Sequence, residues 1–175
     1  HPVFHLSISV DRIFTMIYNI FYREREGIIV EKTYIEMREY RCPRWDELPD
    51  IALYMDQVLT VLDKHLAIFG KTGGDSTTTS TMINNYVKQN VVLSPEKKKY
   101  KREQLAKLLM IGIVKRVLSI SEIDGLISML EKRHALKDAY NLFCENFENA
   151  LRVTFEGKVK DAAIPAGDDA HIALV

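Results

Sequence analysis

The sequence predicts a mainly helical protein that carries one small two-stranded hairpin. Apolar residues recur at helical spacing over long stretches of the 175-residue chain, for example in residues 50–69 and 134–156. Between these stretches, residues 79–102 contain a short polar helix, an apolar run and a lysine-rich loop that ends near a tyrosine. A Ser-Ile-Ser-Glu capping box beginning at Ser119 then opens a further helix.

The short helix, residues 79–89, is expected to have one buried face and one polar face. Thr79 or Ser80 can cap it, because a hydroxyl accepts a hydrogen bond from an amide of the first turn. Helical spacing puts Ile83, Tyr86 and Val87 on the inner face. The residues expected to point outward are Thr81, Asn84, Asn85, Lys88 and Gln89. Asn and Gln can pair with adenine, Thr can contact a thymine methyl group, and Lys can reach guanine or phosphate.

The segment that follows the helix predicts a basic hairpin. Asn90 can adopt the left-handed conformation that ends a helix, and Val91, Val92 and Leu93 are expected to form a short apolar strand. We call residues 94–102 the wing. Its expected contacts with a phosphate backbone are Lys97, Lys98, Lys99, Tyr100, Lys101 and Arg102.

Charge is strongly segregated along the chain. Residues 76–118 contain nine Lys and Arg against two Glu, a net charge of +7. Because the whole chain sums to +0, the remainder carries −7. A basic hairpin directly after a polar helix is the arrangement of a winged helix-turn-helix, in which the helix enters a groove and the wing lies along the backbone. The alternative for each part alone is a solvated helix and a solvated turn.

Two further helices are expected after the wing. The first is strongly apolar, is interrupted by Gly112, and has Lys115 and Arg116 at its negative C-terminal end. Ser119 and Glu122 form the capping box of the second. The apolar residues expected in these two helices are Leu105, Leu108, Leu109, Ile111, Ile113, Val114, Ile123, Leu126, Ile127 and Leu130.

The last long helix, residues 134–156, carries a stripe at the spacing of a coiled-coil seam. The stripe comprises Leu136, Tyr140, Phe143, Phe147 and Ala150. It predicts a homodimer, which would place two recognition helices about one helical turn apart on DNA. The alternative is a packing face within one chain. Gly157 is expected to end this helix, with residues 158–175 as a loose tail.

Four strings of the sequence resemble a bacterial family known as domain of unknown function 1836. The strings are Trp45–Val58, Met82–Lys88, Pro95–Tyr100 and Leu118–Ile123. The resemblance covers about residues 45–155, and it implies no particular activity.

A more distant similarity is to the DNA-binding domain of MerR-type regulators. Their pattern is a helix with paired aromatic residues, Gly-Leu, Pro, a basic wing, Tyr, and a Phe-Ser-x-x-Glu-Ile box. Tyr86 matches the second aromatic residue, Tyr100 matches the tyrosine that closes the wing, and the box matches at Ser119, Glu122 and Ile123. The resemblance implies a winged helix-turn-helix that binds double-stranded DNA.

The chain departs from the MerR pattern at three positions and in one length. Asn84 stands where those regulators usually have a phosphate-binding Arg, Asn85 replaces the first aromatic residue, and Asn90 replaces Gly. The wing is also shorter. The groove contacts of this chain are therefore expected to differ from those of the family.

Composition and motifs argue against an enzyme. The five histidines (His1, His5, His65, His134, His171) are scattered and have no metal-ligand spacing. Cys42 and Cys144 are the only cysteines, and neither belongs to a CxxC motif, so no disulfide framework or zinc site is expected. Gly73-Gly74 lacks the Gly-Lys-Ser/Thr ending of a phosphate loop. No catalytic residue, metal or cofactor is predicted.

We expect three regions in the chain. Residues 1–42 form an amino-terminal extension that is either an added helix or poorly ordered, residues 43–157 form the helical winged domain, and residues 158–175 form the tail. The apolar run 3–22 is interrupted by Asp11 and Arg12, which argues against a membrane span. A reducing cytoplasm fits the two cysteines.

The sequence thus predicts a cytoplasmic, MerR-like winged helix-turn-helix protein that binds double-stranded DNA in transcriptional control. The alternative is a protein-interaction module on the same scaffold, in which the recognition helix contacts a partner protein. The two differ in their expected response to salt, because phosphate contacts release counterions.

Overall fold

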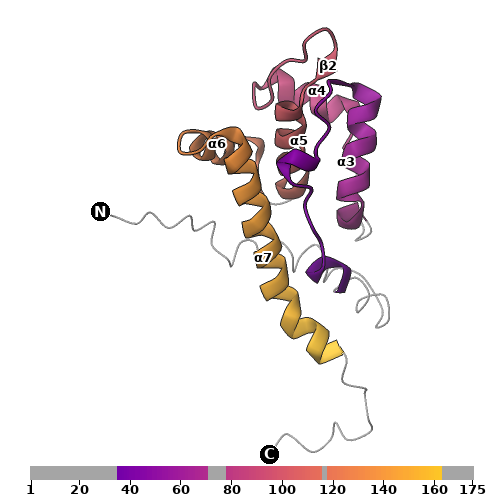
Figure 1. The fold of residues 1–175 in the computed structure, drawn as a ribbon, viewed down its shortest axis with the longest axis vertical. Helices are drawn as coiled ribbons and strands as arrows, with labels where there is room; N and C mark the ends of the chain where they lie inside the picture. Colours follow the sequence, from indigo (N-terminus) through magenta and orange to yellow (C-terminus); the bar gives the residue numbers. More distant parts are fainter. Residues whose placement is uncertain (1–34, 71–77, 116–117, 163–175) are drawn as a thin grey trace, which may run out of the picture.

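The structure, a computed structural model, describes residues 35–70, 78–115 and 118–162. This part of the chain is mainly helical and has one small antiparallel sheet. The elements in chain order are η1 (Trp45–Glu47), β1 (Leu53–Tyr54), α3 (Met55–Gly70), α4 (Ser80–Lys88), β2 (Lys99–Tyr100), α5 (Arg102–Val114), α6 (Ile120–Glu131) and α7 (Leu136–Ala162). Figure 1 shows α3, α4, β2 and α5 grouped at one end, with α7 running away from them.

Helix α5 is the centre of the core, because it contacts α3, α6, α7 and β2. Its side chains from Gln104 to Val114 are buried on almost every side, except that Lys107 is half-buried. Gly112 does not interrupt the helix as the sequence suggested, but lies inside it. A Cβ atom at this position would overlap the Leu66 side chain of α3. Gly112 therefore permits the close approach of the two helices.

Helix α3 begins later than expected. The sequence pattern predicted a helix from Asp50 to Phe69, whereas the structure begins α3 at Met55. Leu53 and Tyr54 instead form β1 and pair with Tyr100 and Lys99 of β2. The apolar residues at 51–54 look the same in a helix and in a strand, and the partner strand decides between them.

Helix α4 has the predicted caps. Thr79 accepts a hydrogen bond from the Met82 amide at 3.2 Å, and Asn90 adopts the left-handed conformation with φ 59°. The amides of Val91 and Val92 then donate to the Tyr86 carbonyl at 3.0 and 3.3 Å. The apolar strand predicted at 91–93 is wrong: Val91 and Val92 are buried in a bend, and 71% of Leu93 is exposed.

The capping box and the final helix follow. The carboxylate of Glu122 accepts from the Ser119 amide at 2.8 Å, as the sequence predicted. Helix α7 starts at Leu136 and continues to Ala162, so Gly157 lies inside the helix and does not end it. The first five residues of the expected tail are therefore helical. The Gly73-Gly74 pair lies outside the described residues, as does the apolar run 3–22.

The segment before η1 belongs to the core. Met37 and Cys42 have no exposed side-chain area, and the Tyr40 ring meets the Phe69 ring edge-on with centroids 4.9 Å apart. Part of the predicted amino-terminal extension is thus integrated with α3 and α7. Among the described residues, no helix combines the length and the apolar composition that crossing a membrane requires.

Candidate nucleic-acid interface

The tip of the wing is a tight two-residue turn. Glu96 and Lys99 exchange two backbone hydrogen bonds, at 3.1 and 2.9 Å, and so enclose Lys97 and Lys98. Both lysines have positive φ angles, 48° and 63°. Positive φ at both central positions is the signature of a type I′ hairpin turn, which usually contains Asn-Gly. A side chain in this conformation costs about 1 kcal/mol or more. The wing therefore presents two adjacent lysines in a conformation that lysine does not favour.

The wing is continuous with the small sheet. Lys99 pairs with Glu96 on one side and with Tyr54 of β1 on the other. The sheet has an inner face, where Leu53 and Tyr100 are buried, and an outer face with Tyr54 and Lys99. The Lys99 ammonium lies 4.8 Å from the centre of the Tyr54 ring, a cation–π distance. These contacts tie the hairpin to the start of α3.

Gln104 holds the base of the wing. Its side chain is buried (7% exposed), and its amide nitrogen donates to the carbonyls of Leu93 and Ser94 at 3.0 and 3.1 Å. Its oxygen accepts from the Lys101 amide at 2.6 Å. One buried side chain thus joins the segments before and after the wing turn to α5. Sequence reasoning missed this residue, because a lone Gln in an apolar helix carries no pattern.

The predicted recognition face lies on α4 as expected. Ile83 and Tyr86 are buried, whereas all five residues predicted to point outward are exposed. These five are Thr81, Asn84, Asn85, Lys88 and Gln89. Burial of Tyr86 raises the pKa of its hydroxyl. The helix ends about ten residues before the wing turn, so one short segment of chain carries both features.

The six predicted wing residues fall into different environments. Lys97 and Lys98 are exposed, and Lys99 is partly buried against Tyr54. Tyr100 is buried (3% exposed), so it anchors the wing rather than presenting a surface. Lys101 forms an exposed ion pair with Glu96 at 2.7 Å, and the Arg102 guanidinium donates to the Pro49 carbonyl at 3.3 Å.

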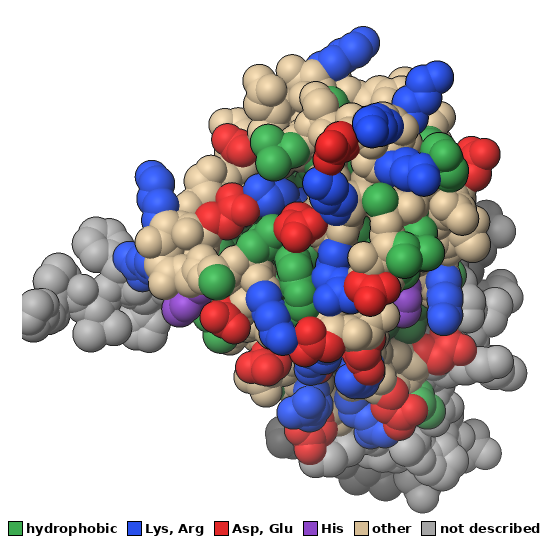
Figure 2. Space-filling view, turned by 45° about the horizontal axis from the view of Figure 1, so that its top comes forward, with side chains coloured by type: hydrophobic (Ala, Val, Ile, Leu, Met, Phe, Trp, Pro, Cys, Tyr) green, Lys and Arg blue, Asp and Glu red, His purple; other side chains and the backbone are tan. Residues whose placement is uncertain are grey.

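Three cations in this region are unpaired within the described part of the chain: Lys88, Lys97 and Lys98. By contrast, Lys107 binds Glu131 at 2.8 Å, and Lys115 donates to Thr78 at 3.2 Å. Figure 2 shows Lys and Arg side chains standing out along the upper part of the molecule, with some Asp and Glu among them. The described cations of this region that have no partner of any kind thus lie at the end of α4 and at the wing turn.

Large apolar side chains are exposed beside the wing. They are Tyr54 (52%) and Leu93 (71%), and Ile51 (66%) is exposed two residues before β1. Tyr54 pairs with Lys99, and the Leu93 carbonyl is bound by Gln104, so both residues border the hairpin. Exposed apolar residues that gather near one structural feature are typical of a contact surface.

The predicted dimer seam is divided between two environments. Tyr140 and Phe147 are buried within this chain, and the Tyr140 hydroxyl donates to the Pro43 carbonyl at 2.8 Å. Leu136 and Phe143 remain partly exposed. The stripe therefore serves at least in part as the intramolecular packing face that was the alternative interpretation.

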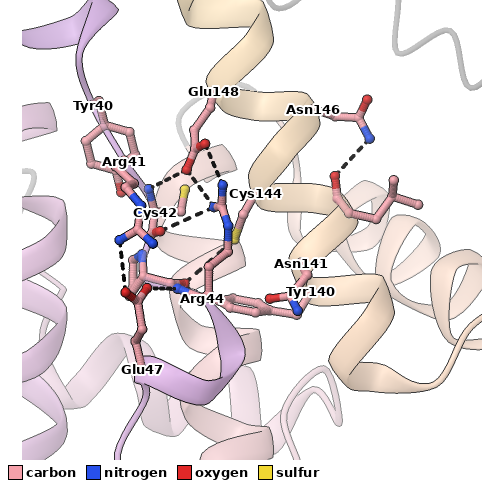
Figure 3. A network of polar contacts seen from close by, with 12 residues as sticks. Tyr40, Arg41, Cys42, Arg44, Glu47, Tyr140, Asn141, Cys144, Asn146 and Glu148 are labelled. Carbon is pink, nitrogen blue, oxygen red and sulfur yellow. Dashed lines mark hydrogen bonds and ion pairs between the residues drawn. The ribbon is translucent and has the colours of Figure 1, made fainter.

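A polar network joins the segment before η1 to α7 (Figure 3). Arg44 and Glu148 form a two-pronged ion pair at 2.6 and 2.7 Å, and the Cys42 amide donates to the same carboxylate at 2.8 Å. Burial raises the pKa of Glu148, but these hydrogen bonds outweigh it and hold the pKa below its ordinary value. The described residues contain no group of three or more His, Cys, Asp or Glu that could hold a metal ion.

The fold and its surface define a mainly helical protein with a basic hairpin set on a small antiparallel sheet. The chain belongs to the family described as domain of unknown function (DUF1836), whose model matches residues 43–143. The matched region runs from the segment before η1 into the first part of α7. Searches of curated proteins and of solved structures found no match.

Proposed function

We propose that this protein binds double-stranded DNA through a MerR-like winged helix-turn-helix and acts in transcriptional control. The observation that carries the proposal is the set of unpaired cations at the end of α4 and at the wing turn, next to an exposed row of Asn, Gln and Thr. Helix α4 would enter the major groove, and the wing would lie on the phosphate backbone.

The wing turn supports this proposal on energetic grounds. Two lysines at positive φ are destabilising in the free protein, and like charges on adjacent residues repel. Contact with phosphate would offset the repulsion. Backbone strain of this kind is often found where a side chain has a binding role.

A homodimer is part of the proposal, because one winged domain of this size covers a single half-site. The contact would use Leu136 and Phe143, which are partly exposed, rather than Tyr140 and Phe147, which are buried within one chain. Phe143→Asp should then convert a dimer to a folded monomer in sedimentation experiments. A wild-type protein that sediments as a monomer at micromolar concentrations would contradict the two-half-site arrangement.

A second candidate function is protein interaction on the same scaffold. Three exposed apolar side chains, Ile51, Tyr54 and Leu93, favour it, because a surface that binds only phosphate has no need of them. In that case α4 and the sheet edge would contact a partner protein, and the lysines would mainly add solubility.

Selection from random DNA duplexes at two salt concentrations tests the proposed function. A winged helix-turn-helix should enrich a preferred sequence and should bind more weakly at the higher salt concentration. Enrichment of a sequence supports DNA reading, and salt-dependent binding without enrichment supports backbone contact alone. Failure to recover any duplex at low salt would favour the protein-interaction alternative.

A further inference from the structure

The two cysteines lie at the same junction of the fold although they are far apart in the chain. Cys42 and Cys144 each have no exposed side-chain area, and the Cys144 thiol donates to the carbonyl of Pro43, the residue next to Cys42, at 4.0 Å. Figure 3 places both sulfur atoms at the junction between the segment before η1 and α7. The chain has no other cysteine. Sequence spacing could not show this pair, because no local motif connects the two positions.

The surrounding contacts hold the two backbones in place. On the Cys42 side, its amide donates to Glu148 at 2.8 Å, and Arg44 binds the same carboxylate at 2.6 and 2.7 Å. On the Cys144 side, Tyr140 binds the Pro43 carbonyl at 2.8 Å. Contacts on both sides of the thiols thus join the same two segments. A bond between the sulfur atoms would reinforce a junction that already exists.

The two thiols have different electrostatic environments. The neighbouring Cys42 side chain lowers the pKa of Cys144 and outweighs burial, with the Tyr140 hydroxyl and the Arg44 charge acting in the same direction. The Cys144 side chain raises the pKa of Cys42, and burial adds to this effect. Tyr40 and Glu148 are the other ionisable groups near the pair. Of the two thiols, Cys144 is therefore the more acidic.

We propose that Cys42 and Cys144 are a reversible dithiol–disulfide pair that links the segment before η1 to α7. The oxidant is a two-electron thiol oxidant, such as a diazene. The Cys144 thiolate adds to one nitrogen of the N=N bond, and the other nitrogen takes up a proton. The Cys42 thiolate then attacks the Cys144 sulfur and expels the nitrogen, which is protonated. Two thiols and one diazene thus yield one disulfide and one hydrazine.

Burial of the thiols affects the rate of oxidation, and the length of the loop that the disulfide closes affects the stability of the oxidised protein. A small oxidant reaches the thiols through local opening of the segment before η1, so oxidation should be slower than for an exposed thiol. The bond would close a loop that contains α3, α4, α5 and α6, and a bond across a long loop strongly restricts the unfolded chain. The oxidised protein should therefore be more stable. This proposal does not depend on DNA binding.

The test uses the full chain, purified in reductant, freed of reductant and incubated with the diazene diamide. Free thiols are counted with a maleimide after denaturation, and the product is examined by non-reducing electrophoresis. We expect the count to fall from two to zero in a monomer, with both thiols restored by dithiothreitol. The melting temperature should rise by roughly 5–15 °C. The matched variants Cys42→Ala and Cys144→Ala should each show no such rise.

Three results would overturn the proposal. The first is a count of two free thiols in the protein after incubation with diamide, when a small dithiol added to the same sample as a control is fully oxidised. The second is disulfide-linked dimers as the main product. The third is an intramolecular disulfide that lowers the melting temperature, which would mean that the bond forms only in a distorted chain. The thiol count on the wild-type protein remains decisive even if the alanine variants fail to fold.

Discussion

Lys97 and Lys98 occupy the two central positions of the wing turn, with φ angles of 48° and 63°. Their flanking residues, Glu96 and Lys99, close the turn with two backbone hydrogen bonds. Stability alone would favour Asn-Gly at these positions, because both accept positive φ more readily. The charge of the turn and its stability can therefore be changed separately.

Replacing Lys97 with Asn and Lys98 with Gly should separate binding from folding. The double variant should gain about 1 kcal/mol in the free energy of unfolding, because strain at the turn is relieved. Its DNA affinity should fall for all duplexes alike. The slope of log affinity against log salt should flatten by up to about 1.8, at roughly 0.9 for each phosphate that the variant no longer neutralises.

The control for that variant removes two cations elsewhere. Lys132 and Arg133 are exposed beyond the end of α6, so Lys132→Gln with Arg133→Gln changes the net charge equally. This control should leave the salt slope unchanged. Equal slopes for the wild type and the wing variant would place the turn outside the interface.

Substitutions on α4 should affect sequence preference instead. Asn85→Ala or Lys88→Ala should each cost about 1–3 kcal/mol of binding free energy at the preferred site, because an alanine side chain cannot bind a base edge by hydrogen bonds. Nonspecific binding should change little with Asn85→Ala. Asn149→Ala, at an exposed position of α7, is the matched control in the same titration. An Asn85 variant with unaltered affinity and preference would show that α4 does not read bases.

Replacing each of two helical glycines with alanine should change the free energy of unfolding in opposite directions. At Gly112 the new methyl group would overlap Leu66, so Gly112→Ala should lower the free energy of unfolding by about 1–3 kcal/mol. At Gly125, which is exposed and has no atom near the added methyl group, Gly125→Ala should raise it by about 0.5–1 kcal/mol. Urea unfolding measures both. A stabilising Gly112→Ala would contradict the close packing of α3 on α5.

The Arg44–Glu148 pair should make stability depend on pH in the acidic range. The folded-state pKa of Glu148 lies below its ordinary value of 4.5, so the unfolded chain takes up a proton first as the pH falls. The contribution of the ion pair to the free energy of unfolding is complete above pH 4.5. It is lost as the pH falls through the lower, folded-state pKa of Glu148. Glu148→Gln should remove this part of the pH dependence and cost about 1–3 kcal/mol at neutral pH.

Glu145→Gln is the matched control for that measurement, because Glu145 is exposed on the same helix. In plots of the free energy of unfolding against pH, the difference between the wild type and Glu148→Gln should narrow as the pH falls. The Glu145→Gln plot should follow that of the wild type. Parallel curves for the wild type and Glu148→Gln across the acidic range would mean that the ion pair contributes no net stability.

Local patterns predicted the elements that depend on local chemistry. The caps at Thr79 and Asn90 and the Ser119–Glu122 box are confirmed, because each is a hydrogen bond or a backbone preference within a few residues. The exposed face of α4 is confirmed for the same reason, since it follows from the helical period. Whether that face binds DNA stays a prediction.

The errors arose where distant residues decide the outcome. Leu53 and Tyr54 form a strand only because Tyr100 and Lys99 are there to pair with them. The buried Gln104 side chain holds the wing by binding carbonyls about ten residues earlier in the chain. Cys42 lies near Cys144 only because α7 packs against the segment before η1. No pattern within either segment contains this information.

The salt dependence of duplex binding by the wild-type protein tests the central claim most directly. Affinity for a duplex is measured over a range of salt concentrations and plotted as log affinity against log salt. If Lys97 and Lys98 each neutralise one phosphate, the slope should be about −1.8 per protomer. No affinity for any duplex at low salt, or an affinity that does not change with salt, would contradict the account.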